Sequence, residues 1–195
     1  MDKLPTQDQM CGFKEPGKYI SNIYRRLFGI VVYKSWGEIF ELDVLLSVCE
    51  FSTIVELGTG FGATAAFLGT HSVISGADVY TYDNSPMVTD KVQNLFNRIG
   101  VKYEVLDIFE NEEKIANLIQ RDGRTLLYCD NGDKVREMKL WGKYLKKDDV
   151  VLIHDYPEEV PQRAIDETCE MHGLIPFVED WHKGHVTSHR AMIKE

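Results

Sequence analysis

Three glycines at alternating positions form the segment of this chain best suited to lie against a ligand. Gly58, Gly60 and Gly62 follow an apolar run and precede an expected short helix at residues 63–68. Because glycine has no side chain, the backbone at such a turn can bend tightly and approach a bound molecule closely. A strand, a glycine turn and a helix in this order are typical of nucleotide sites, although an ordinary tight turn has the same pattern.

Carboxylates stand at the ends of the next two predicted strands. Asp83 follows the strand at 78–82, 21 positions beyond Gly62, where a carboxylate can accept hydrogen bonds from both ribose hydroxyls of an adenosine. Asp107 follows the strand at 101–106 and is placed to meet an adenine amino group. Ligands of open α/β sheets bind at this edge, so the pattern predicts an adenosine site. The alternatives are a turn or capping role for Asp83 and a solvated loop position for Asp107.

A second group of polar residues ends two further strands. Asp130 follows the strand at 125–129, and His154 and Asp155 follow the strand at 150–153. Two carboxylates with an imidazole or waters can hold Mg²⁺, which prefers oxygen ligands. Without a metal, His154 is a candidate general base. A third interpretation gives His154 and Asp155 only capping roles.

Glu56, two residues before the first glycine of the turn, bears on which nucleotide is bound. The segment from Gly58 to Ala63 also fits a dinucleotide fingerprint. A carboxylate at Glu56, however, suits an ammonium group better than a pyrophosphate. The chain is short for a separate substrate domain, and none of its nine tyrosines has a lysine four positions on, as short-chain reductases require. An NAD(P)-dependent oxidoreductase and a non-catalytic nucleotide-binding protein are the alternatives.

These motifs resemble those of class I S-adenosylmethionine-dependent methyltransferases over residues 36–195. The resemblance rests on Glu56-Leu-Gly-Thr-Gly-Phe-Gly62, Tyr82-Asp83-Asn84, Leu106-Asp107-Ile108 and Tyr128-Cys-Asp130. It implies that the glycines pass beside the methionine part of S-adenosylmethionine, that Asp83 holds the ribose, and that Asp107 with Ile108 flanks the adenine. The implied cofactor-binding residues are Glu56, Gly58, Thr59, Gly60, Gly62, Asp83, Asn84, Asp107, Ile108 and Asp130.

The second group is similar to the metal-dependent branch of that family, which includes catechol O-methyltransferase-like and sugar O-methyltransferases. The resemblance implies Asp130, His154 and Asp155 as ligands of Mg²⁺. The tailoring enzymes have Glu-Asp, and the catechol type Asp-Asn, where this chain has His154-Asp155. The family's candidate base falls at Asp133, next to Lys134, and the predicted catalytic residues are Asp130, Lys134 and His154. The implied reaction is O-methylation of a small hydroxylated acceptor, and such enzymes often form homodimers.

The rest of the pattern predicts the fold that positions these residues. Apolar strands alternate with amphipathic helices, which is typical of a parallel sheet with helices on both faces. Two closing strands, at 174–178 and 185–193, are joined briefly and should pair antiparallel. We therefore expect a Rossmann-like, doubly wound α/β fold with seven strands, the last antiparallel. The helix after the second strand should be capped by Ser85 and close at Gly100.

Composition limits the partners and the organisation. With 195 residues and 44% hydrophobic composition, the chain suits one domain, which we place at 19–195 after a polar lead-in at 1–18, with a helical segment at 19–51. A net charge of −9 without a basic run argues against nucleic acid. No secretory signal or membrane-length apolar run is present, and four scattered cysteines favour the cytoplasm. His182, His185 and His189 are interpreted as residues of the last hairpin rather than a metal site.

Overall fold

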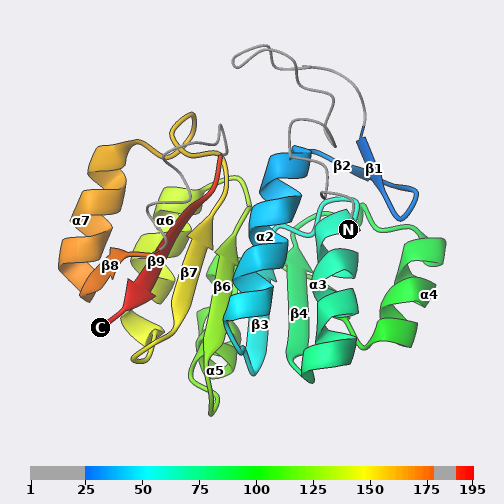
Figure 1. The fold of residues 1–195 in the computed structure, drawn as a ribbon, viewed down its shortest axis with the longest axis horizontal. Helices are drawn as coiled ribbons and strands as arrows, with labels where there is room; N and C mark the ends of the chain where they lie inside the picture. Colours follow the sequence, from blue (N-terminus) through cyan, green and yellow to red (C-terminus); the bar gives the residue numbers. More distant parts are fainter. Residues whose placement is uncertain (1–24, 178–187) are drawn as a thin grey trace, which may run out of the picture.

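The computed structural model describes residues 25–177 and 188–195, and its centre is a seven-stranded sheet (Figure 1). The strand order is β5-β4-β3-β6-β7-β9-β8. Pairs from β5 to β7 are parallel, whereas β9 runs antiparallel to both of its neighbours. The predicted sheet is confirmed. Its strands are β3 (Thr53–Leu57), β4 (Asp78–Asp83), β5 (Lys102–Val105), β6 (Thr125–Cys129), β7 (Val150–Ile153), β8 (Leu174–Pro176) and β9 (Arg190–Lys194).

Helices cover both faces of the sheet, as expected for a doubly wound fold. Successive strand residues point to opposite faces, so Ile54 packs with the helices of one face and Val55 with those of the other. One face carries α2 (Trp36–Val48), α3 (Ala63–Ser75) and α4 (Asp90–Ile99). The other carries α5 (Glu112–Ile119), α6 (Lys134–Trp141) and α7 (Gln162–His172), with the short 3₁₀ helices η1 (Ile108–Glu110) and η2 (Gly142–Tyr144).

The register of the central strands brings the candidate residues to one edge. Leu57 of β3 pairs with Tyr82 of β4 and with Cys129 of β6, and Cys129 pairs with Ile153 of β7. The residues that follow these positions therefore leave the sheet side by side. Parallel pairing alone thus aligns the glycine turn with the strand-end aspartates and histidine.

The N-terminal part of the fold corrects the expected helical segment at 19–51. Residues 1–24 lie outside the described part, and the next residues form a hairpin of β1 (Arg25–Leu27) and β2 (Ile30–Val32). The turn between them has φ values of +54° at Phe28 and +78° at Gly29, the left-handed geometry that matches the twist of a two-residue hairpin. The helical pattern begins only at α2.

Two other helix boundaries also differ from expectation. The helix after the glycine turn runs to Ser75 and ends at Gly76, a C-cap with a φ of +80°, and Gly69 within it packs closely against Val101, which a Cβ would approach to 2.3 Å. The next helix starts at Asp90 with Thr89 as its N-cap, four residues later than the predicted N-cap Ser85. Cys49 and Cys129 are buried core residues.

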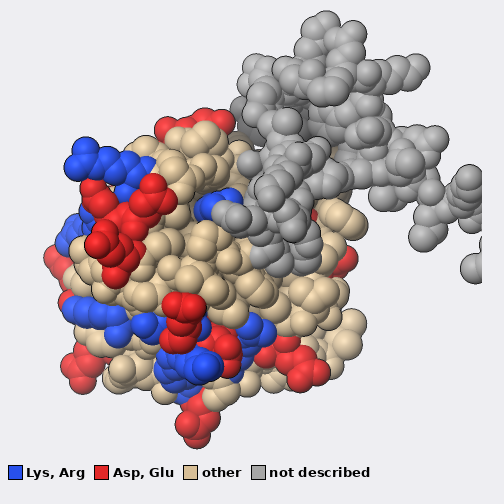
Figure 2. Space-filling model, turned by 60° about the vertical axis from the view of Figure 1, so that its left-hand side comes forward, with Lys and Arg blue, Asp and Glu red and all other residues tan. Residues whose placement is uncertain are grey.

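Charged side chains of both signs are interspersed on the face shown in Figure 2. Ion pairs link neighbouring helices, such as Lys139 to Glu167 at 3.1 Å between α6 and α7. Within the described ranges, none of the helices has the length and hydropathy needed to cross a bilayer. The cytoplasmic location stays a prediction.

Candidate functional site

The glycine turn between β3 and α3 admits only glycine at two positions. Gly58 has a φ of +104°, and a Cβ there would lie 2.3 Å from the carbonyl oxygen of Asp130. Gly62 has a φ of +87°, and its Cβ would lie 2.7 Å from the nearest α4 side chain. The amides of Gly58 and Thr59 donate to the carbonyl of Tyr82 at 2.8 and 3.1 Å, which fixes the turn to β4. The backbone is thus held bare at the sheet edge.

Asp83, the last residue of β4, is bonded directly to this turn. One carboxylate oxygen accepts a hydrogen bond from the Gly60 amide at 2.8 Å, and the other accepts one from the Ser85 amide at 2.9 Å. The side chain is buried and lines the same cavity as the turn. Carboxylate oxygens have several lone pairs, so Asp83 can still accept hydrogen bonds from ligand hydroxyls.

Glu56 lies beneath the turn, in the middle of the sheet. It is fully buried, and its Oε2 accepts a hydrogen bond from the Thr81 hydroxyl of the paired strand at 2.5 Å. Its Oε1 has no hydrogen-bond partner within the described residues. Burial raises the pKa of Glu56 to about 8, against the hydrogen bond from Thr81. Glu56 is not among the residues that line the cavity, so the predicted contact with a ligand ammonium stays a prediction.

A cavity of about 290 Å³ joins the glycine turn to the second group of predicted residues. Its wall includes Gly58, Thr59, Gly60 and Asp83 from the cofactor prediction, and Asp130, His154 and Asp155 from the predicted catalytic and metal group, together with Lys34. The two groups that the sequence placed at separate strand ends therefore face one space.

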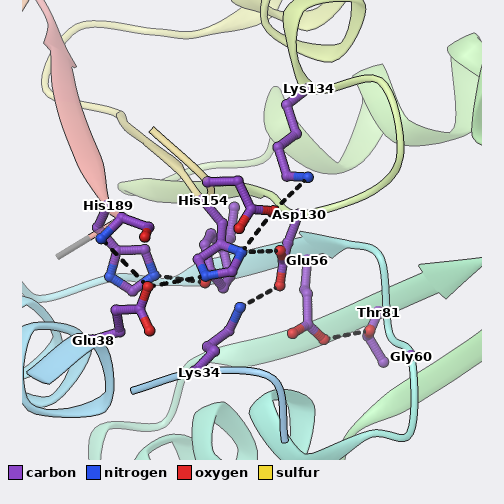
Figure 3. A network of polar contacts seen from close by, with 12 residues as sticks. Lys34, Glu38, Glu56, Gly60, Thr81, Asp130, Lys134, His154 and His189 are labelled. Atoms are coloured by element: carbon purple, nitrogen blue, oxygen red, sulfur yellow. Dashed lines mark hydrogen bonds and ion pairs between the residues drawn. The ribbon is translucent and has the colours of Figure 1, made fainter. Parts of the chain in front are cut away.

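His154 makes the central contacts of the second group (Figure 3). Its Nδ1 lies 2.8 Å from Asp130 and 3.1 Å from Asp155, and its Nε2 lies 3.2 Å from Glu38 of α2. Burial alone would lower the pKa of His154, but hydrogen bonds to these three carboxylates outweigh it and raise the pKa to about 10. The imidazole is therefore protonated at neutral pH and does not suit the predicted role of general base.

Two lysines contact the aspartates of this group. The ammonium of Lys34 lies 2.5 Å from Asp130, and that of Lys134 lies 2.9 Å from Asp155 and 2.7 Å from Glu159. Figure 3 shows both lysines pointing toward the group, from two sides. Burial would raise the pKa of Asp130, but Lys34 and His154 hold it below its usual range.

Tyr128 and His189 lie next to His154 and contact each other. The Tyr128 hydroxyl lies 2.8 Å from Nε2 of His189, and the His189 ring contacts the ring of His154 edge-on at 5.4 Å between centroids. Burial lowers the pKa of His189, so its ring is neutral. His189 belongs to the hairpin histidines for which the sequence predicted no metal role, whereas His182 and His185 lie outside the described residues.

The spacing of Asp130, His154 and Asp155 is compatible with a metal, because one donor atom from each lies within 4.8 Å of the others. The contacts that these three residues already make are not compatible with a metal. A metal needs an unprotonated nitrogen, but both nitrogens of His154 contact carboxylates, and an ammonium group is bound to each aspartate. As folded, these residues do not fit Mg²⁺.

The predicted adenine residues lie apart from the cavity wall. Asp107 is the N-cap of η1 and accepts a hydrogen bond from the Phe109 amide at 2.8 Å, while the Ile108 side chain is buried in the core. Asn84 is exposed. None of these three is among the residues that line the cavity, and their predicted roles stay predictions.

Lys34 and Glu38 were missed in the sequence, although a signal for their place exists. Ser35 and Glu38 form a capping box: the Glu38 amide donates to the Ser35 hydroxyl at 3.1 Å, and the Ser35 amide donates to the Glu38 carboxylate. The Ser-x-x-Glu pattern marks a helix start. It would have placed Lys34 directly before α2.

Comparison with known proteins agrees with the architecture. No protein-family model matches the chain, and no curated protein matches its sequence. Among solved structures, one of CmcI with Mg and S-adenosylmethionine has a TM-score of 0.64 at 15% identity, covering 98% of this chain and 86% of that one. CmcI is a class I S-adenosylmethionine-dependent O-methyltransferase, and this chain has the same fold. A CmcI apo structure gives a TM-score of 0.65 at 15% identity, with coverages of 100% and 85%. A protein from Klebsiella pneumoniae described as a candidate O-methyltransferase gives 0.58 at 11% identity, with coverages of 86% and 84%.

The glycine turn and Asp83 fit S-adenosylmethionine, whereas the second group of residues does not fit a metal. Gly58, Thr59 and Gly60 line the cavity, so the backbone of the turn faces it, and at Gly60 there is open space where a Cβ would be. Asp83 is held beside the turn by its hydrogen bond from the Gly60 amide. The residues that would hold the cofactor are therefore preorganised without it.

Proposed function

We propose that this chain is an S-adenosylmethionine-dependent methyltransferase that methylates a hydroxyl group of a small acceptor. The observation that carries the proposal is the hydrogen bond from the Gly60 amide to Asp83, in a cavity that also contains Asp130 and Lys34. This arrangement combines a place for an adenosyl group with charged side chains suited to a polar acceptor. The fold shared with CmcI supports the cofactor assignment.

The main contribution of the protein to methyl transfer is to align the methyl donor with the acceptor. When bound, S-adenosylmethionine supplies a sulfonium methyl group whose leaving group is a neutral thioether. The turn from Gly58 to Gly62 and the carboxylate of Asp83 would hold and orient it, while Asp130 and Lys34 face the acceptor. Holding two reactants in line accounts for a large part of such rate enhancements.

The first test is calorimetry of the purified protein with S-adenosylhomocysteine and with NAD. We expect micromolar binding of S-adenosylhomocysteine, no binding of NAD, and loss of binding in Asp83→Ala but not in the exposed control Asp122→Ala. Preferential binding of NAD would replace the proposal with an oxidoreductase.

The second test is transfer of a labelled methyl group from S-adenosylmethionine to a panel of phenols, enols, sugars and carboxylic acids. We expect transfer to hydroxylated acceptors. Binding of S-adenosylhomocysteine without transfer to any member of the panel would favour a non-catalytic nucleotide-binding protein.

A further inference from the structure

Lys34 is a buried lysine at the wall of the proposed methyl-transfer cavity. Only 4% of its side chain is exposed, and its ammonium lies against Asp130 and 5.1 Å from the centre of the Tyr128 ring. Burying a charge is costly unless it is paired, so a lysine in this position needs the carboxylate beside it. The capping box of Ser35 fixes the backbone that presents it.

Apart from the exposed Glu159, the carboxylates and cations in contact around Lys34 are equal in number without an added ion. Charged and titratable groups surround Lys34 from several elements. They are Glu38 of α2, Glu56 of β3, Tyr128 of β6, Asp130 directly after β6, His154 and Asp155 after β7, Lys134 of α6 and His189 before β9. Three carboxylates, of Glu38, Asp130 and Asp155, contact three cations, which are Lys34, Lys134 and His154, and a fourth carboxylate, of the exposed Glu159, also contacts Lys134. A divalent cation would have to displace Lys34 or lie next to it.

Within the part of the cavity wall that the structure describes, each side chain that could take a proton already has partners. The three carboxylates of the wall are engaged: Asp83 with the amides of Gly60 and Ser85, Asp130 with Lys34 and His154, and Asp155 with Lys134 and His154. Among the described residues of the wall, the one imidazole is His154, and both of its nitrogens contact carboxylates. An acceptor that must be deprotonated by a base is poorly served here.

We propose that the Lys34 ammonium takes the place of a metal ion and stabilises the oxyanion of the acceptor, which is an acidic hydroxyl of the phenol or enol class. This rests on the proposed function. The hydroxyl releases its proton to water, and Lys34 donates a hydrogen bond to the resulting oxyanion. The oxygen then forms a bond to the methyl carbon while the carbon–sulfur bond breaks, and that electron pair stays on sulfur as the thioether. A preorganised donor at a developing or full negative charge is a strong source of stabilisation in a buried site.

The test is the ionisation of 4-nitrophenol bound to the protein in the presence of S-adenosylhomocysteine, followed by phenolate absorbance across pH, with and without chelator. In the wild type we expect the pKa of the bound probe to fall by about 1 to 3 units, as for an acid near a fixed positive charge, with no effect of chelation. Lys34→Arg should keep most of the shift and Lys34→Met should lose it. Lys139→Met, which removes a lysine of the α6–α7 surface pair, should behave as wild type.

Two further measurements test whether Lys34 itself acts on the acceptor oxygen. Methyl transfer to 4-nitrophenol should fall about 100-fold in Lys34→Met, the usual cost of losing an oxyanion donor. S-adenosylhomocysteine affinity should stay within threefold of the wild type, and a loss of tenfold or more would make Lys34 a cofactor ligand instead. Lys34→Gln repeats each measurement should the methionine variant unfold.

Several outcomes overturn the proposal. These are an equal probe pKa in wild type and Lys34→Met, a shift that chelator removes and Mg²⁺ restores, and a wild type that binds no 4-nitrophenol. None of them bears on cofactor binding. Absence of S-adenosylhomocysteine binding to the wild type would instead remove the proposed function itself.

Discussion

Replacing the buried carboxylate of Glu56 with an amide should change how the stability of the protein depends on pH. In the fold, burial raises the pKa of Glu56 to about 8 from an ordinary value of 4.5. Between these values the folded protein keeps a proton that the unfolded chain has released. The free energy of unfolding therefore falls as pH rises through this window, and this group contributes most stability at the acidic end.

The size of the effect follows from the two pKa values. At about 1.4 kcal/mol per unit, the contribution of Glu56 should fall by about 4 kcal/mol between pH 4.5 and 8. Glu56→Gln removes the titration but keeps an oxygen that can accept from Thr81. Glu137, a second buried glutamate whose pKa burial raises to about 8, is present in both proteins, so its effect cancels in the difference.

The assay is urea unfolding of wild type and Glu56→Gln at half-unit pH steps from 4.5 to 8.5. We expect the stability of the variant relative to wild type to rise by about 4 kcal/mol across the range, with unchanged m-values. A difference that stays constant within 1 kcal/mol (roughly the error of such extrapolations) would refute the reasoning, since Glu56 would then be ionised in the fold.

Four other substitutions test the site. Gly58→Ala should lower the free energy of unfolding by about 3 kcal/mol or more, because the new Cβ meets the backbone after β6. Gly60→Ala has open space around its Cβ and should cost only about 1 to 2 kcal/mol. Equal losses of the two variants in urea unfolding would contradict this. Asp83→Asn should weaken S-adenosylhomocysteine binding about tenfold in calorimetry, since one acceptor oxygen is replaced by a donor, and wild-type affinity would show that Asp83 does not meet the ligand. Ser35→Ala should cost about 1 kcal/mol of stability by removing the capping box, and because it loosens the backbone beside Lys34 it should also slow methyl transfer; an unchanged rate would show that the cap does not position Lys34.

Local patterns determined much of this protein. Alternating apolar strands and amphipathic helices predict the doubly wound sheet, because burial of one helix face and of whole parallel strands is visible in residue spacing. The glycine turn and Asp83 were also readable, since a strand followed by spaced glycines and a carboxylate at a strand end can be recognised within single elements. Asp130, His154 and Asp155 were correctly expected to meet, because neighbouring parallel strands end at the same edge.

Only the tertiary structure decided what these residues are bonded to. Lys34 lies 96 positions before Asp130, and His189 lies 61 positions after Tyr128, so no local pattern connects either pair. The protonation of His154 follows from three carboxylates that arrive from α2, β6 and the end of β7. A set of residues that looks in sequence like a metal site is, in the fold, a group of paired charges, because pairing depends on distances between elements rather than on spacing within them.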